Sequence, residues 1–176
     1  WTVPGRGRQL AEPGDLYSSA AEKYGPVIRR IAMAYEANPD RRRDLLQEIH
    51  IQLWLSLRRF DGRSSLLTWV YRVAHNVAAT HVLRERRLAG RLVGLEDLED
   101  AAGAVDGVAE AVKKRAVSTL FERISRLKPL DRQVILLYLE GETAASIAEV
   151  TGLSASHVAV KIHRVKRMLN EEETHG

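Results

Sequence analysis

The 176-residue sequence has no cysteine and no run of about 20 apolar residues, the length that a membrane-spanning helix needs. Without cysteine the chain cannot form disulfides or bind zinc through thiolates, which excludes a zinc finger and fits a reducing compartment. The segment from Trp1 to Arg8 lacks the apolar core of a signal peptide. We therefore expect a cytoplasmic protein that is not inserted in a membrane.

Enzyme and metal signatures are also missing from the sequence. No Ser/His/Asp arrangement, glycine-rich phosphate loop or pair of acids stands out, so we expect no catalytic residue and no cofactor. His157 and His163 have no carboxylate or thiolate partner nearby in the sequence, so we expect no metal site. His50, His75 and His81 are interpreted as ordinary residues of surface helices.

What the sequence does contain is enough apolar residues to fold, together with a cluster of arginines. Hydrophobic residues make up 45% of the chain, which excludes wholesale disorder, and the net charge is +4. Between positions 58 and 91 the basic residues are opposed only by Asp61 and Glu85; they are Arg58, Arg59, Arg63, Arg72, Arg84, Arg86, Arg87 and Arg91. This stripe favours a polyanionic partner, although a solvated basic surface is the plainer alternative.

Apolar residues recur at steps of three and four, which predicts an all-α fold. We expect a first helix over 16–35 that ends before Asn38-Pro39, and a second that begins at Asp40. The apolar stripe predicted for the second is Leu46, Ile49, Leu53, Leu57 and Phe60. Ser64 or Ser65 should cap a third helix. Its predicted inner face is Leu67, Val70, Val73, Ala74 and Val77.

A stretch without lysine or arginine, 92–110, follows the third helix and carries six acids among glycine and alanine. A flexible tether kept soluble by its acids is the plainest interpretation. The predicted organisation is therefore two small helical domains joined by an acidic linker. Its segments are a loosely ordered 1–14, a helical domain over 15–87, the linker 88–111, a second helical domain over 112–172 and a tail over 173–176.

Near the C-terminus three short helices are predicted over 131–140, 143–151 and 154–171. Gly141 and Gly152 separate them, and Ser154 is a good cap for the last one. In the last helix an apolar stripe (Val158, Ile162, Val165 and Leu169) leaves Ser156, Val160, His163, Arg164 and Arg167 on the opposite face. Such a helix-turn-helix fits the major groove of DNA, although a plain helical hairpin is the alternative.

Aromatic residues interleave with arginines in the N-terminal half, a composition suited to stacking the bases of an opened DNA strand. Aromatic residues at helical spacing more often belong to a core. We therefore assign Trp54 and Trp69 mainly to packing. Phe60 and the loop 61–65 are reserved for contact with nucleic acid.

These motifs resemble the extracytoplasmic-function group of bacterial RNA polymerase sigma factors over nearly the whole chain, from about Tyr17 to Asn170. Asp44-Leu45-Leu46-Gln47-Glu48 is similar to the group's segment that binds the clamp helices of the polymerase β′ subunit. Phe60-Asp61-Gly62-Arg63-Ser64-Ser65, followed by Thr68-Trp69 and Tyr71-Arg72, resembles the loop and helix that read and open the −10 element. Residues 127–170 resemble the domain that reads the −35 element.

The resemblance implies three sets of contact residues. Polymerase binding is expected at Asp44, Leu45, Gln47 and Glu48. Binding of the −10 element is expected at Phe60, Asp61, Arg63, Ser64, Arg72 and Asn76, with Phe60 and Asn76 holding an unpaired base. Binding of the −35 element is expected at Ser156, His157, Ala159, Val160, His163, Arg164 and Arg167. Ala159 and Val160 replace the basic and small polar residues common in the group.

The implied function is that of an alternative sigma factor. Its implied partners are core RNA polymerase, through the β′ clamp helices and the β flap, promoter DNA and an anti-sigma factor. The resemblance also implies that the acidic linker runs toward the path of the nascent RNA. The main alternative is a DNA-binding repressor or activator that uses the C-terminal helix-turn-helix alone, with the N-terminal helices as a dimerisation or sensing module.

Overall fold

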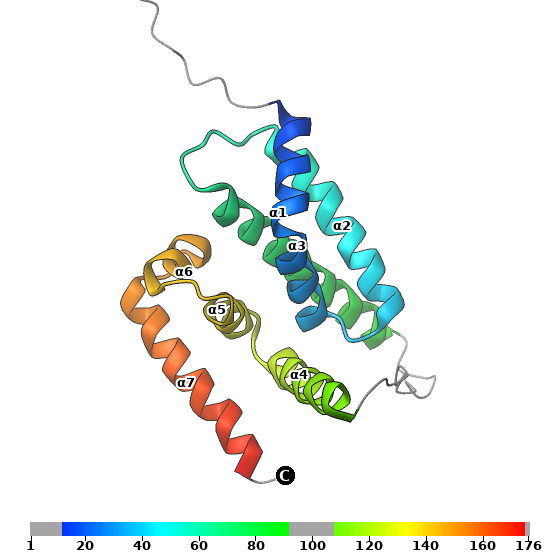
Figure 1. Ribbon diagram of the computed structural model, residues 1–176, viewed down its shortest axis with the longest axis vertical. Coiled ribbons are helices and arrows are strands. Elements are labelled where there is room, and N and C mark those ends of the chain that lie inside the picture. Colours follow the sequence, from blue (N-terminus) through cyan, green and yellow to red (C-terminus); the bar gives the residue numbers. More distant parts are fainter. Residues whose placement is uncertain (1–11, 92–107, 175–176) are drawn as a thin grey trace, which may run out of the picture.

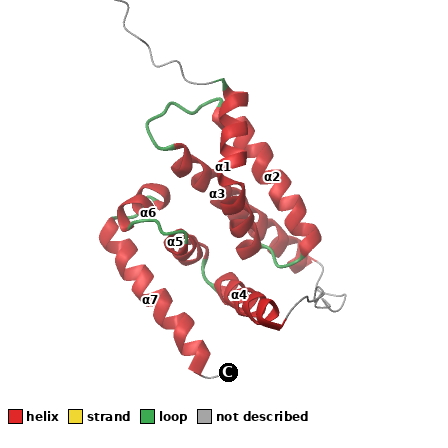
Figure 2. Ribbon diagram, viewed as in Figure 1, coloured by secondary structure: helices red, strands yellow, loops and turns green. Residues whose placement is uncertain are grey.

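The computed structural model describes residues 12–91 and 108–174, and within them every regular element is a helix, as predicted (Figure 2). The helices are α1 (Pro13–Tyr35), α2 (Pro39–Leu57), α3 (Leu66–Arg91), α4 (Val108–Arg126), α5 (Pro129–Leu139), α6 (Ala144–Thr151) and α7 (Ala155–Thr174). None of the described helices is long and apolar enough to cross a membrane. Most of the predicted acidic linker, 92–107, lies outside the described residues, as do 1–11.

Helices α1, α2 and α3 pack side by side and form what we call the N-terminal half (Figure 1). From α2 the core takes Leu45, Ile49, Leu53 and Leu57, which recur every four residues and are all buried. The predicted stripe missed Leu45, which is fully buried, whereas its first and last residues, Leu46 and Phe60, are partly buried and pack against the core. Leu45 lies one position away on the helix, on the side that faces α1 and α3.

Local capping fixes the ends of α2 and α3. The Asn38 side chain accepts hydrogen bonds from the backbone N–H groups of Asp40 and Arg41, and Pro39 occupies the first helical position, where a missing N–H has no cost. Of the two serines predicted to cap α3, Ser65 does so: its Oγ accepts from the Thr68 N–H at 3.0 Å. Helix α3 continues to Arg91, beyond the end expected near position 87.

Helices α4 to α7 form the C-terminal half. Thr143 caps α6, and Ser154 caps α7 by accepting from the His157 N–H at 3.3 Å. Gly152 leaves α6 with a φ of 76°, a left-handed conformation that glycine adopts without strain. This confirms the predicted helix-turn-helix, with Val158 and Val165 of α7 buried and Ile162 and Leu169 partly buried.

The two halves touch. Helix α4 packs against α1, and α6 packs against α3 near the start of that helix (Figure 1).

Candidate nucleic-acid interface

The loop before α3 is built by short-range hydrogen bonds. Asp61 accepts a bond from the Arg63 N–H at 3.0 Å, and Gly62 has a φ of 74°, which turns the chain sharply. The same Asp61 carboxylate pairs with the Arg63 guanidinium at 3.2 Å. Arg63 nonetheless leaves 90% of its side chain exposed. The loop therefore presents one accessible cation at a fixed turn.

Phe60 is positioned by the first turn of α3. Its ring lies edge-on to that of Trp69, with 5.4 Å between the ring centroids. Trp69 in turn donates from its indole nitrogen to Ser56 at 3.0 Å and packs against the core, as predicted. Phe60 is therefore a partly buried ring on a rigid support.

The prediction for Trp54 was wrong. This ring is 40% exposed on α2, and the Arg58 guanidinium stacks on it at 4.4 Å from the centroid. Sequence spacing could not separate the two tryptophans, because both fall near apolar stripes.

Arg72 and Asn76 follow Trp69 along α3. Asn76 is exposed and lies seven residues beyond Trp69, about 10 Å along the helix axis. Phe60 packs against Trp69, so it lies near the start of α3, and Asn76 lies farther along that helix. Arg72, between them, is half-buried because its guanidinium reaches α6, where Nε and Nη2 both donate to the carbonyl oxygen of Glu149, the former at 3.2 Å.

The segment predicted to bind polymerase lies on α2. Asp44 and Gln47 are exposed, and Glu48 accepts from Arg84 of α3 at 3.1 Å. This bond raises the pKa of Arg84. Leu45 is fully buried, so it can support this surface only by anchoring the helix.

The same face of α2 continues into apolar residues that sequence reasoning missed. Ile51 and Leu55 are 49% and 43% exposed, and they follow Glu48 by three and seven residues. That spacing sets them on the stripe that carries Gln47 and Glu48. The sequence did carry a signal for them, because large apolar residues on the solvent-facing side of an amphipathic helix suggest a binding surface.

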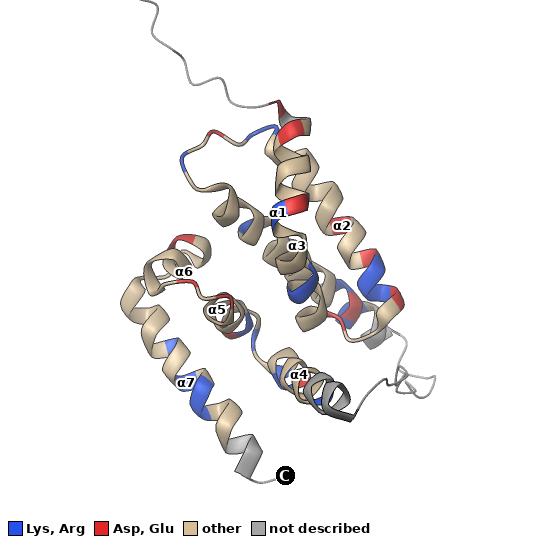
Figure 3. Ribbon diagram, in the orientation of Figure 1, with Lys and Arg blue, Asp and Glu red and all other residues tan. Residues whose placement is uncertain are grey.

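The exposed face of α7 is the one predicted to read the −35 element. Ser156, His157, Ala159, Val160 and His163 are exposed there, and Val160, at 66%, is the most exposed large apolar residue among those that the structure describes. Arg164 and Arg167 are also exposed, and Figure 3 shows Lys and Arg along the middle of this helix. All seven residues thus share one accessible helix, with an apolar patch among polar groups.

Two cations of α7 are held by a buried acid that the sequence reading did not identify. Asp131, at the start of α5, is 4% exposed. It accepts from Lys161 Nζ at 2.7 Å and from Arg164 Nη2 at 2.8 Å and 2.9 Å. Arg164 therefore already has an intramolecular partner while half of its side chain stays exposed.

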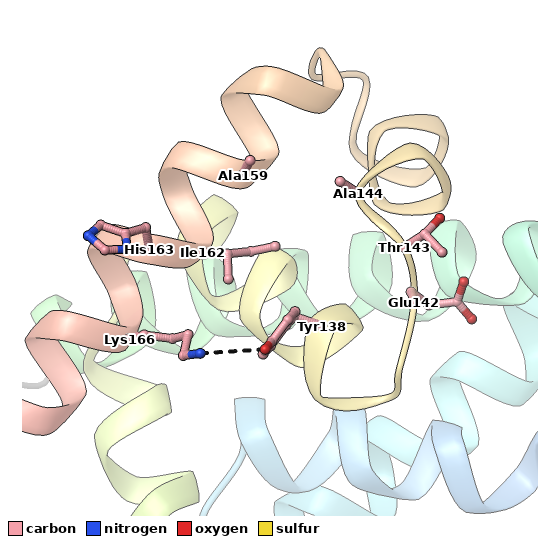
Figure 4. A pocket seen from close by; sticks show the side chains of 8 residues that line it. All are labelled: Tyr138, Glu142, Thr143, Ala144, Ala159, Ile162, His163 and Lys166. Carbon is pink, nitrogen blue, oxygen red and sulfur yellow. Dashed lines mark hydrogen bonds between the residues drawn. The ribbon is translucent and has the colours of Figure 1, made fainter.

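A shallow hollow of about 380 Å³ lies between α7 and the turn from α5 to α6 (Figure 4). Ala159 and His163 line one side, and Tyr138 and Thr143 line the other. Lys166 Nζ approaches the Tyr138 hydroxyl at 3.5 Å across its floor. The hollow therefore lies directly beside the exposed face of α7.

Histidines and tyrosines are buried in the N-terminal half, contrary to the expectation that His75 and His81 lie on the surface. The Tyr35 hydroxyl and His75 Nδ1 share a hydrogen bond of 3.2 Å. Burial lowers the pKa of His75 to about 3 and raises that of Tyr35 to about 12, so both are neutral near pH 7. His81 contacts the Glu36 carboxylate at 3.2 Å. An apolar neighbourhood formed by three helices, invisible in one helix's pattern, accounts for the error.

Tyr71 is also buried, at the boundary between the halves. Burial raises its pKa, and the negative charges of Glu142 and Glu140 raise it further.

Within the described residues no group of three or more histidine or acidic side chains is arranged to hold a metal ion.

Comparison with known proteins gives two family matches, one in each half. The family described as Sigma-70 region 2 matches residues 20–88, and Sigma-70, region 4 matches residues 119–169. The first match covers the helices that a free-standing regulator would have used for dimerisation or sensing.

Individual relatives agree with both family matches. The ECF RNA polymerase sigma factor SigW of Bacillus subtilis is 25% identical over 90% of this chain and 89% of its own length. The RNA polymerase sigma-H factor of Pseudomonas aeruginosa is 28% identical over 84% of this chain and 78% of its own length.

A solved structure shares the fold. The sigma factor RpoE of Bartonella quintana, in complex with the anti-sigma factor NepR, superposes with a TM-score of 0.68 at 17% identity, over 88% of this chain and 94% of that one. At that identity the likeness concerns the fold alone.

Proposed function

The chain belongs to the extracytoplasmic-function group of bacterial RNA polymerase sigma factors, and from this premise we propose how its surfaces serve promoter recognition. A factor of this group binds core RNA polymerase, recognises the −35 and −10 promoter elements and helps to initiate transcription by local melting of DNA. The feature that carries the assignment of surfaces is the separation of two candidate DNA-binding faces, one on each helical half.

The polymerase-binding face is proposed to be the exposed stripe of α2. Asp44, Gln47 and Glu48 supply acidic and amide groups, and Ile51 and Leu55 supply an apolar strip beside them. A central apolar patch with a polar rim is the usual anatomy of a protein interface. A basic partner helix would take over Glu48 from Arg84, so the pairing within the chain would be exchanged for one with polymerase.

The −10 face is proposed to run from Phe60 along the start of α3. Phe60 offers a ring that Trp69 already supports, and an aromatic ring can stack with an unpaired base of any sequence. Arg63, at the loop turn, and Arg72, on α3, would neutralise the strand's phosphates. Asn76 would contact the strand farther along the helix. Asp61 and Ser64 would shape the loop.

The −35 face is proposed to be the exposed side of α7, inserted in the major groove. Arg164 and Arg167 would meet phosphates, and the N-terminal residues Ser156, His157 and Ala159 would meet base edges. Val160 would contact a thymine methyl group, which an apolar side chain can recognise. His163 would lie between these two sets of contacts.

We further propose that the protein acts in the cytoplasm by positioning and melting DNA, without chemistry or a cofactor of its own. The chain between the halves would lie along the path of the nascent RNA, and the C-terminal half would contact the β flap. Because the sigma factor RpoE, which shares this fold, was solved with an anti-sigma factor bound, we propose that a partner of that kind covers these surfaces when transcription is not required.

A charge-reversed variant tests the docking face. In D44K/E48K the acidic rim becomes basic, and we expect affinity for core polymerase to fall by at least about tenfold, because like charges across an interface oppose binding. D15K/E22K, which changes the same charge on α1, is the control and should bind normally. Affinity for fluorescently labelled core polymerase and run-off transcription with added core polymerase are measured for all three proteins. Equal affinity of the docking variant and the parent would reject this face.

A further inference from the structure

Asp131 joins the start of α5 to the helix whose exposed side is proposed to read DNA. Its carboxylate is buried, and a buried charge is costly unless cations and hydrogen bonds compensate it. Lys161 Nζ donates to one oxygen at 2.7 Å, and Arg164 Nη2 donates to both oxygens, at 2.9 Å and 2.8 Å. Two positive side chains of α7 therefore share one negative charge.

The place of this charge is fixed by α5. Asp131 lies in the first turn of the helix, where unpaired backbone N–H groups and the helix dipole favour an acid. The helix is anchored by its apolar side, since Val134 and Ile135 are buried in the core. Asp131 therefore holds its partners at one point and does not follow their movements.

The two partners of Asp131 differ in how far they reach the surface. The Lys161 side chain is 23% exposed and that of Arg164 is 49% exposed. Val160 and Arg167, both exposed, lie four residues before and three residues after Arg164, so they are its neighbours along one side of α7. Lys161 thus mainly neutralises the acid, whereas Arg164 lies between the acid and the exposed face.

The bonds to Asp131 occupy only one end of the Arg164 side chain. Both are donated by Nη2, which leaves Nε and Nη1 for a second acceptor. A DNA phosphate is an acceptor of the right charge and geometry for a guanidinium. Because a long side chain loses rotamer freedom when it is immobilised on binding, one that is already held in place loses less.

From these contacts we propose that Asp131 is a positioning residue for the −35 face. It does not touch DNA; it holds the Arg164 guanidinium in the orientation that a phosphate needs. This inference rests on the proposed function in assigning Arg164 to a DNA contact.

The first test uses the sign of the effect on DNA binding. Asp131→Asn keeps the shape of the side chain and removes a negative charge, which by charge alone should tighten binding to a polyanion. Positioning predicts the opposite, a fall of about twofold in the affinity of the full chain for fluorescent duplex DNA. A duplex of random sequence suffices, because phosphate contacts do not depend on sequence.

Glu149→Gln is the charge-matched control, since Glu149 is an exposed acid of the same half. It removes the same charge and leaves Arg164 held, so it should bind the duplex at least as tightly as the parent. Asp131→Asn with an affinity equal to that of Glu149→Gln would overturn the proposal.

A second test separates positioning from a loss of stability. In an Arg164→Ala chain there is no guanidinium to position, so adding Asp131→Asn should weaken duplex binding no further. A destabilised C-terminal half would instead lose affinity in both backgrounds. Equal losses on adding Asp131→Asn to the parent and to Arg164→Ala would therefore also overturn the proposal.

The same variants distinguish this inference from the proposed function. If Arg164→Ala weakens duplex binding and Asp131→Asn does not, positioning fails and the DNA contact of Arg164 stands. If Arg164→Ala binds like the parent, the contact is wrong and positioning falls with it. Run-off transcription tests the function itself. If core polymerase and the parent give no transcript while the two variants depend on each other as expected, the function fails and positioning stands.

Discussion

The two halves of the molecule keep their candidate DNA-binding residues in different states. In the N-terminal half Phe60 is packed against Trp69 and Arg72 is held by α6, whereas the C-terminal half presents Val160 and its neighbours openly on α7. The exposed side of α7 is accessible as it stands, whereas Arg72 must leave the Glu149 carbonyl oxygen before it can contact a DNA strand.

Low pH should give the largest difference between the halves, because it destabilises the N-terminal half, where His75 is buried. Its pKa of about 3 when folded is below the ordinary value of about 6.5, so the unfolded chain binds a proton that the folded chain refuses. The stabilisation is complete above about pH 6.5 and is lost as pH falls. Between pH 6.5 and 4.5 it should fall by about 2 kcal/mol.

Denaturant unfolding at these two pH values measures the loss. His75→Gln removes the titrating ring and should show a correspondingly smaller difference between pH 6.5 and 4.5, even if it is less stable at both. A His75→Gln chain with the parent's full pH dependence would contradict the assignment to His75.

Truncation of Phe60 should give the next largest effect. Phe60→Ala removes a stacking ring worth about 1–3 kcal/mol per base, so formation of the open complex should fall by roughly tenfold or more at saturating polymerase. Permanganate reactivity of promoter thymines measures it. Tyr138→Ala, an exposed aromatic of the other half, should leave the bubble intact. An equal loss of permanganate reactivity in both variants would contradict the proposal that the N-terminal half binds the opened strand.

Much of this fold could be predicted because its helices and their ends are determined by short-range sequence features. The apolar steps of α7, the Ser154 and Ser65 caps and the turn at Gly152 are short-range features, and the structure has them where the sequence placed them. Helix ends were less accurate. Helix α5 was predicted to begin at position 131, but it begins at Pro129, because proline is favoured in the first turn of a helix. The residue before Pro129 was correctly predicted to lie outside the helix.

The sequence could not show which side chains meet across helices. His75 is buried because α1 supplies Tyr35 above it, and Asp131 matters because α7 brings Lys161 and Arg164 to it. The contact of Arg72 with α6 joins residues 77 positions apart. Such pairs depend on tertiary packing, which periodicity within one helix does not encode.

In the C-terminal half, the corresponding test of stability is at Asp131. Asp131→Ala leaves Lys161 and Arg164 without their shared acid, and we expect the free energy of unfolding to fall by about 1–2 kcal/mol, since both cations remain partly solvated. Glu122→Ala breaks an exposed pair with Arg126 and should cost less than about 0.5 kcal/mol. Chemical denaturation compares the two, and similar losses would refute a special role for Asp131.

Arg164→Ala should have the smallest effect, because Asp131 already shares this guanidinium. We expect duplex affinity to fall by about threefold and the salt dependence of binding to flatten by roughly one ion. Fluorescence anisotropy at several salt concentrations measures both. An unchanged salt dependence would remove Arg164 from the DNA interface.

Both halves are proposed to act on one promoter, and only when the chain is bound to polymerase. Permanganate footprinting of a promoter fragment identified by run-off transcription tests it with core polymerase alone, the chain alone and both together. Reactive thymines at the −10 element are expected only when both are present. Reactive thymines with the chain alone, or none in the complete mixture, would contradict it.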